Sequence, residues 1–169
     1  MTQVWKTSSA EETIAVGRTL ASILAPPKLL ILRGDLGAGK TTLVKGIAAG
    51  LGAAEVDEVT SPTFTLVHEY TGRDGGSSVS VGNTYASGDR VVRGQASEPV
   101  RLFHLDLYRL EQERELLTLG LEEIEAAGNI VLVEWGDKFA SLVARADGEI
   151  AIRIDGEHTR TVVLNLKGL

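Results

Sequence analysis

Apolar and polar positions in the first third of the chain fall into blocks with different spacing. Ser8 and Ser9 are each followed three residues later by a glutamate, a capping-box pattern that predicts a helix over residues 9–24. Residues 28–33 form an apolar run without alternation, which is typical of a strand buried on both faces of a parallel sheet. Residues 40–51 have the spacing of a second helix.

The rest of the chain continues this succession of extended and helical segments. Apolar runs flanked by turn residues predict strands at 64–70, 100–106, 129–135, 149–155 and 161–166. A glutamate-rich segment over about 111–126 has helical spacing, and Gly156-Glu157-His158 turns the last two strands into a hairpin. The order predicts an α/β fold with a mostly parallel sheet, flanking helices and an antiparallel C-terminal hairpin.

One segment, residues 72–99, departs from this pattern. It contains six glycines and five serines and has no helical periodicity. Because so little apolar surface cannot offset the entropy of ordering it, we expect an exposed loop or mobile hairpin inserted into a single domain spanning residues 1–169.

Composition limits the class of protein. With 43% hydrophobic and 24% charged residues, the chain is expected to be globular, and its net charge of −6 disfavours direct capture of a nucleic-acid backbone. The absence of cysteine removes disulfides, thiolate nucleophiles and zinc clusters, so any metal must have oxygen ligands. No run of apolar residues suits a membrane span or a leader, and we expect a cytoplasmic protein.

The strongest chemical signal is a phosphate loop between the strand at 28–33 and the helix at 40–51. The residues from Gly34 to Thr41 fit the pattern of a glycine, four residues and then Gly-Lys-Ser/Thr. In such a loop, backbone N–H groups surround phosphate oxygens, Lys40 supplies a charge for the β- and γ-phosphates, and the Thr41 hydroxyl holds Mg²⁺. The expected nucleotide-binding residues are Gly37, Ala38, Gly39, Lys40, Thr41 and Thr42.

Three other positions are candidates for the chemistry. Thr63 enters a predicted strand where P-loop enzymes often place a hydroxyl that senses the γ-phosphate, although a Ser-Pro turn explains it equally well. Asp106 ends an apolar strand and could hold Mg²⁺ or its water, or simply cap the next turn. Glu134 follows four aliphatic residues, so a metal or cation partner is favoured because burying its charge is costly.

Three nearby features have simpler interpretations. His104 is expected to be a hydrogen-bonded interior histidine, and Trp135 is either core or an exposed aromatic for a partner. The glutamates of the helical segment suit a solvated face, with an acidic docking surface as the alternative. They are Glu111, Glu113, Glu115, Glu122, Glu123 and Glu125.

Four blocks, in order, resemble the TsaE family of small bacterial P-loop ATPases, which are required for the threonylcarbamoyladenosine (t6A) modification of tRNA adenosine 37. They are Gly-Asp-Leu-Gly-Ala-Gly-Lys-Thr-Thr (34–42), Ser-Pro-Thr-Phe-Thr-Leu-Val (61–67), His-Leu-Asp-Leu-Tyr-Arg-Leu (104–110) and Val-Glu-Trp (133–135). Together they span most of the chain. Where this chain has residues 72–99, members of the family usually have a brief hairpin.

The resemblance implies a site and partners. It implies that Lys40 binds ATP phosphate, that Thr41 and Glu134 hold Mg²⁺, and that Asp106 occupies the Walker-B-like position. It also implies action with the proteins TsaD and TsaB, with tRNA reached only indirectly through their complex.

Two other function classes fit the same loop. A small-molecule kinase could use the 72–99 insert, with Arg73, Arg90 and Arg93, as a lid over a second substrate. A nucleotide-sensing adaptor would bind ATP and dock without useful turnover. A GTPase is disfavoured because the chain has no Asn/Thr-Lys-x-Asp guanine signature.

Overall fold

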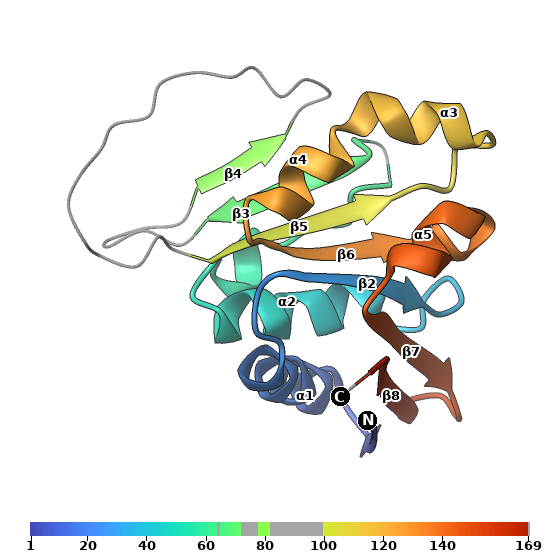
Figure 1. The fold of residues 1–169 in the computed structure, drawn as a ribbon. Coiled ribbons are helices and arrows are strands. Elements are labelled where there is room, and N and C mark those ends of the chain that lie inside the picture. The colour runs from blue at the N-terminus through green and yellow to red at the C-terminus, as the bar shows by residue number, and fades with distance from the viewer. Residues whose placement is uncertain (64, 72–77, 82–99, 169) are drawn as a thin grey trace.

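The computed structural model describes residues 1–63, 65–71, 78–81 and 100–168, whose strands form one sheet in the order β1-β8-β7-β2-β6-β5-β3-β4 (Figure 1). The strands are β1 (Thr2–Thr7), β2 (Lys28–Arg33), β3 (Val67–Thr71), β4 (Ser78–Val81), β5 (Arg101–Asp106), β6 (Ile130–Glu134), β7 (Gly148–Ile154) and β8 (Arg160–Leu166). The helices are α1 (Ala10–Ile23), α2 (Lys40–Gly50), α3 (Glu113–Leu116), α4 (Leu121–Ala126) and α5 (Ala140–Arg145). Single 3-10 turns are η1 (Val56–Glu58), η2 (Leu117–Leu119) and η3 (Gly136–Lys138).

The centre of the sheet is parallel and both of its margins are antiparallel. Strands β7, β2, β6 and β5 run in one direction, β8 and β3 run against them, and β7 and β8 form the C-terminal hairpin. Helices α1 and α2 cover one face of the sheet, and α3, α4 and α5 cover the other (Figure 1). The α/β fold with a parallel core and a C-terminal hairpin is therefore as predicted.

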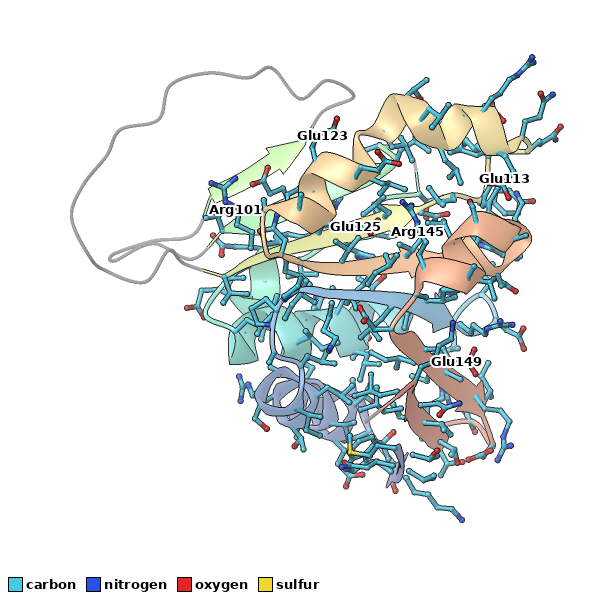
Figure 2. All side chains as sticks on the ribbon, in the orientation of Figure 1. Arg101, Glu113, Glu123, Glu125, Arg145 and Glu149 are labelled. Carbon is cyan, nitrogen blue, oxygen red and sulfur yellow. The ribbon has the colours of Figure 1, made fainter. Side chains whose placement is uncertain are left out.

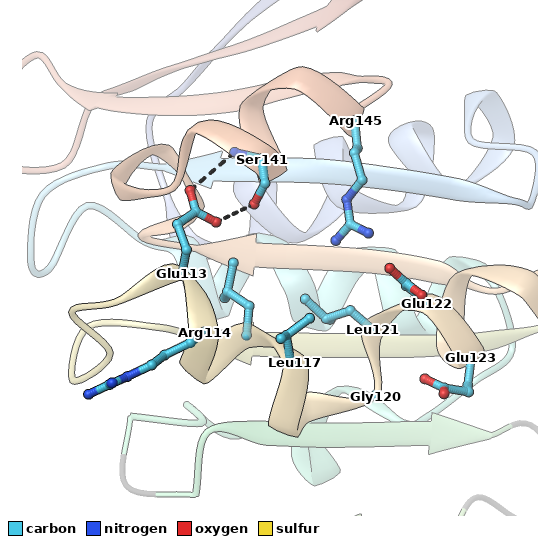
Figure 3. A pocket seen from close by; sticks show the side chains of 10 residues that line it. Glu113, Arg114, Leu117, Gly120, Leu121, Glu122, Glu123, Ser141 and Arg145 are labelled. Atoms are coloured by element: carbon cyan, nitrogen blue, oxygen red, sulfur yellow. Dashed lines mark hydrogen bonds between the residues drawn. The ribbon is translucent and has the colours of Figure 1, made fainter.

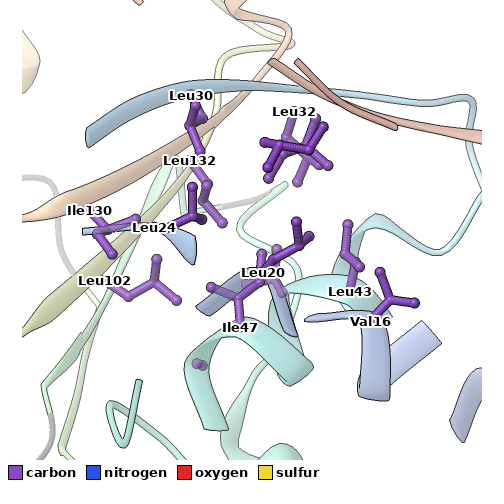
Figure 4. Packing of buried hydrophobic residues seen from close by; sticks show 14 of the residues in the cluster. Val16, Leu20, Leu24, Leu30, Leu32, Leu43, Ile47, Leu102, Ile130 and Leu132 are labelled. Carbon is purple, nitrogen blue, oxygen red and sulfur yellow. The ribbon is translucent and has the colours of Figure 1, made fainter. Parts of the chain in front are cut away.

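Strand β2 has an unbroken apolar run because each face of the sheet has its own core. Leu30 and Leu32 pack with α1 and α2 (Figure 4), whereas Leu29 and Ile31 pack under α4 and α5. This double burial confirms the expectation for residues 28–33 and places the end of β2 at the centre of the molecule.

Helices α1 and α2 cross at two glycines. A Cβ atom at Gly46 would lie 2.9 Å from the Cα of Gly17, and a Cβ at Gly17 would lie 2.7 Å from the Cα of Gly46. Only hydrogen atoms fit at this contact, so the two backbones touch directly.

Some boundaries differ from the predicted ones. Strand β3 begins at Val67, not at residue 64, because the N–H of Leu66 bonds to the carbonyl of Pro62 at 2.9 Å in a turn with Leu66 at φ 67°. Phe64 lies outside the described residues. The helical segment at 111–126 is broken into α3, η2 and α4, with Gly120 in the left-handed region. Strand β1 and helix α5 were not expected from the sequence.

The segment 72–99 is described only in part. Residues 78–81 form β4, which pairs antiparallel with β3, so this part is a strand of a hairpin. The remainder, including Arg73, Arg90 and Arg93, lies outside the described residues. In the part of the chain that the structure covers, every helix is too short or too polar to cross a membrane.

Candidate functional site

The phosphate loop joins the end of β2 to the start of α2. Gly39 caps α2 in the left-handed conformation, with φ 105°, which a residue with a side chain rarely adopts. A Cβ atom at Gly34 would lie 2.7 Å from Cγ2 of Ile152 on β7. A Cβ at Gly37, where φ is 77°, would meet no atom within 4 Å, so the space beside this residue is open.

Lys40, the first residue of α2, directs its ammonium group into the loop. Its Nζ donates to the carbonyl of Gly34 at 2.6 Å and to that of Asp35 at 3.2 Å, and lies 3.6 Å from Oε2 of Glu134. Its side chain is only 12% exposed. The ammonium group therefore lies within the loop among oxygen acceptors.

Two carboxylates meet at the carboxyl edge of the parallel strands. Asp106 ends β5 and Glu134 ends β6, and the two residues are register partners in neighbouring strands. Both are buried, with exposed fractions of 3% and 5%. Glu134 is also the register partner of Leu32 in β2, one residue before Arg33 and the loop. The topology thus brings Glu134 to the phosphate loop and places Asp106 beside Glu134, at the edge where α/β sheets hold ligands.

The two oxygens of Glu134 have different partners. Oε2 faces Lys40, and Oε1 lies 2.8 Å from Nε2 of His104. His104 is completely buried in β5, which confirms that it is an interior, hydrogen-bonded histidine. Its Nδ1 has no hydrogen-bond partner among the described residues.

Thr63 reaches the site from the turn before β3. Its hydroxyl donates to Oδ2 of Asp106 at 3.0 Å and lies 2.8 Å from the hydroxyl of Ser61. Oδ1 of Asp106 accepts from the N–H of Tyr108 at 2.9 Å. Asp106 therefore caps the turn after β5, as one interpretation expected, and also binds the hydroxyl at position 63.

A buried polar cluster holds the turn that carries Thr63. Nδ1 of His68 lies 3.2 Å from the carbonyl of Thr60 and 3.1 Å from the hydroxyl of Tyr70, while Nε2 lies 2.7 Å from the hydroxyl of Thr65. Burial lowers the pKa of His68 below its usual value of 6.5, with a smaller lowering from His104, and the Thr60 carbonyl opposes this shift. Burial also raises the pKa of Tyr70.

A small hollow of about 240 Å³ opens beside the loop. Its lining includes Lys40, Glu134 and Trp135. Trp135 is 43% exposed and adopts a left-handed backbone with φ 61°, and its ring lies 5.2 Å from that of Tyr108. Trp135 is therefore exposed at the rim of the hollow and is not part of the core, while its contact with a partner stays a prediction.

The available oxygen donors suit Mg²⁺ better than a metal ion whose ligands must all come from the protein. Thr41 and Thr42 lie in the first turn of α2, beside Lys40. Within the described residues, no group of three or more histidine, aspartate or glutamate side chains could hold a metal ion. Mg²⁺ typically takes one or two protein oxygens and completes its shell with phosphates and water, so a hydroxyl and a carboxylate are sufficient.

One residue that contacts the loop was not predicted from the sequence. Arg160, at the start of β8, donates from Nε to the carbonyl of Ala38 at 3.0 Å and from Nη1 to the carbonyls of Gly156 and Thr159, both at 2.9 Å. It ties the phosphate loop to the C-terminal hairpin. Since 122 residues separate Arg160 from Ala38, no local spacing could have indicated the contact.

A larger hollow of about 440 Å³ lies between α3, α4 and α5, away from the phosphate loop (Figure 3). At its margin Glu113 accepts bonds from the backbone and hydroxyl of Ser141, and these bonds lower the pKa of its carboxyl group. Glu125 pairs with Arg145 at 3.3 Å, and both are labelled in Figure 2. These two glutamates join neighbouring elements, so the expected solvated acidic face is partly a set of structural contacts.

Comparison with known proteins identifies one family. The family model described as threonylcarbamoyl adenosine biosynthesis protein TsaE matches residues 7–162. The tRNA threonylcarbamoyladenosine biosynthesis protein TsaE of Bacillus subtilis is 34% identical over 164 residues, which cover 97% of this chain and 85% of the relative. The protein of the same name from Treponema pallidum is 30% identical over 156 residues, with coverages of 92% and 95%.

A solved structure has the same fold. The crystal structure of YdiB from Bacillus subtilis superposes with a TM-score of 0.63 at 30% sequence identity, and the match covers 99% of this chain and 87% of YdiB. Because the family model covers most of the chain and the relatives match along nearly their whole length, this chain belongs to the TsaE family of threonylcarbamoyl adenosine biosynthesis proteins.

Proposed function

We propose that this protein binds ATP with Mg²⁺ in its phosphate loop and hydrolyses it in support of t6A modification of tRNA. The observation that carries the proposal is the meeting of Lys40 and Glu134, with Nζ and Oε2 3.6 Å apart, beside an open glycine loop. A lysine ammonium in the loop and a buried carboxylate at the end of a parallel strand are the charges that phosphoryl transfer to water requires.

Each side chain has a distinct part in this proposal. Lys40 exchanges its loop carbonyls for phosphate oxygens, which it neutralises as a point charge. When bound, Mg²⁺ would offset the negative charge of the phosphate oxygens. Thr41 supplies the hydroxyl that holds the metal, and Glu134 either completes the metal site or orients the attacking water. Asp106, with Thr63 at 3.0 Å, positions the hydroxyl that would sense the γ-phosphate.

The biological setting of the proposal comes from the family. The names of the relatives place them in t6A biosynthesis. We propose that this chain acts in the cytoplasm with the proteins TsaD and TsaB, and that it reaches tRNA only through that complex. The net charge of −6 supports an indirect encounter with tRNA, since it disfavours capture of a phosphate backbone.

The test is release of inorganic phosphate from ATP, measured for the protein alone and after addition of TsaD and TsaB. We expect slow turnover alone and faster turnover in the complex, with both abolished by EDTA. Absence of turnover in both conditions, with ATP still bound, would favour the nucleotide-sensing adaptor. The alternative of a small-molecule kinase gains no support, because the three arginines expected in its lid lie outside the described residues.

A further inference from the structure

The two oxygens of Glu134 are held from opposite sides by residues of different elements. Lys40, on α2, lies 3.6 Å from Oε2, and His104, on β5, lies 2.8 Å from Oε1. The shorter contact belongs to the histidine, whose ring is completely buried. His104 lies on β5, the strand beside β6, so its contact with Glu134 does not depend on where the Lys40 side chain points.

The protonation pattern of the His104 ring follows from its neighbour. A carboxylate without a proton can only accept a hydrogen bond, so Nε2 carries the hydrogen that points at Glu134. Nδ1 has no partner among the described residues. For packing alone a leucine would suit this position better, because it leaves no buried polar atom unpaired. The contact with Glu134 is what the imidazole adds.

We propose that His104 is a positioning residue that keeps the Glu134 carboxylate directed into the site while Lys40 turns to phosphate. This inference rests on the proposed ATPase function and deepens it. When the ammonium group shifts toward phosphate oxygens, Oε2 loses its cation partner. The carboxylate then keeps one fixed oxygen, and the free oxygen faces the metal or the attacking water.

Substitutions of His104 and one control variant test the proposal by steady-state ATP turnover in the complex with TsaD and TsaB. His104→Leu removes the donor, and we expect kcat to fall about 10- to 100-fold while KM for ATP changes less than about threefold. His104→Gln places an amide donor near the position of Nε2 and restores most of the turnover. If His104→Leu fails to fold, His104→Asn is used instead, because its shorter amide cannot reach Glu134. His158→Leu, on the exposed turn of the β7–β8 hairpin, is the matched control.

A double-mutant comparison separates positioning from a general effect on folding. If His104 acts through Glu134, His104→Leu adds less than about a twofold loss when Glu134 is already glutamine. A second readout needs no turnover. In the ¹⁵N NMR spectrum of the protein without nucleotide, the ring of His104 shows a proton on Nε2, and its resonance moves in Glu134→Gln but not in Lys45→Ala.

The outcomes distinguish this inference from the proposed function. If the wild-type complex does not hydrolyse ATP, the proposed function fails and the positioning role fails with it. A different outcome overturns the positioning role alone. In that outcome the wild-type complex hydrolyses ATP, Glu134→Gln abolishes the turnover, and His104→Leu leaves kcat per folded molecule unchanged. A proton on Nδ1 in place of Nε2 also overturns it.

Discussion

Arg160 donates from Nε to the carbonyl oxygen of Ala38 at 3.0 Å, which fixes the middle of the phosphate loop to the start of β8. The same guanidinium donates to carbonyls of the turn that precedes β8. The C-terminal hairpin therefore sets the direction in which the loop presents its backbone, although it supplies none of the loop's own residues.

Replacing Arg160 with glutamine should weaken nucleotide binding. The loop would lose a hydrogen bond from a charged donor, and we expect the Kd for ATP to rise about tenfold. Fluorescence titration with a labelled ATP analogue measures the effect. Arg153→Gln on β7 is the control, since Arg153 is exposed and pairs only with Asp155 among the described residues. Equal Kd values for the two variants would mean that the hairpin contact does not shape the loop.

Lys40→Ala should abolish tight binding of ATP, with an increase in Kd of more than about 100-fold, because no other cation contacts the loop carbonyls of Gly34 and Asp35 in the described structure. The fold should survive with a slightly lower Tm. Glu134 keeps its bond to His104 but loses its cation. Lys45→Ala, on the same helix, should leave both quantities unchanged. Wild-type affinity in Lys40→Ala would remove the phosphate loop from the proposal.

Glu134→Gln should separate binding from hydrolysis. The glutamine carbonyl can still accept from His104, so the local structure is kept while the charge is lost. We expect ATP to bind normally and turnover with TsaD and TsaB to fall about 100-fold or more. Glu149→Gln is the control, because Glu149 pairs with Arg33 outside the loop. A lower Tm with unchanged hydrolysis per folded molecule would assign Glu134 a structural role only.

Gly46→Ala should destabilise the protein by overpacking the crossing of α1 and α2. The added Cβ would lie 2.9 Å from the Cα of Gly17, so the helices must separate, at a cost of about 1–3 kcal/mol. At this chain length that corresponds to a fall in Tm of roughly 2–12 °C, measured by thermal denaturation. Lys45→Ala again serves as the control. A Tm equal to that of the wild type would show that the crossing can adjust.

His68 should make the protein less stable as the pH falls. Its pKa is lowered in the folded state, so the unfolded chain binds the proton more readily, and the free energy of unfolding decreases below about pH 6.5. The decrease from one group cannot exceed about 1.4 kcal/mol per pH unit. Urea denaturation at pH 7.5 and 5.5 should show a smaller loss in His68→Gln than in the wild type. His158→Gln, at an exposed position, should lose as much stability as the wild type. Equal losses in the wild type and in both variants would contradict the assignment of this pH dependence to His68.

Local patterns were enough to predict the central fold. The apolar run of β2, the capping serine of α1, whose hydroxyl accepts from the N–H of Glu12 at 3.1 Å, and the hairpin around Gly156 are each determined by neighbouring residues. The phosphate loop was predictable for the same reason, because its residues are contiguous.

Contacts between distant residues were not predictable in this way. The meeting of Glu134 with Lys40 depends on β6 lying beside β2, and the bond between Thr63 and Asp106 depends on an antiparallel β3. The sequence indicated that Glu134 needs a cation or metal, but the topology decides which one it meets. Short edge elements such as β1 were missed because pairing with β8, more than its own periodicity, determines them.

The direct backbone contact of Gly17 with Gly46 has a mechanical consequence. At this crossing point no side chain separates α1 from α2, so the contact has no flexible layer that could absorb a relative displacement. A tilt of α2 on binding of a ligand at its N-terminal end must therefore carry α1 along. Since β1 leads directly into α1 and pairs with β8, such a movement would be transmitted to the antiparallel margin of the sheet, far from the residues that touch the ligand.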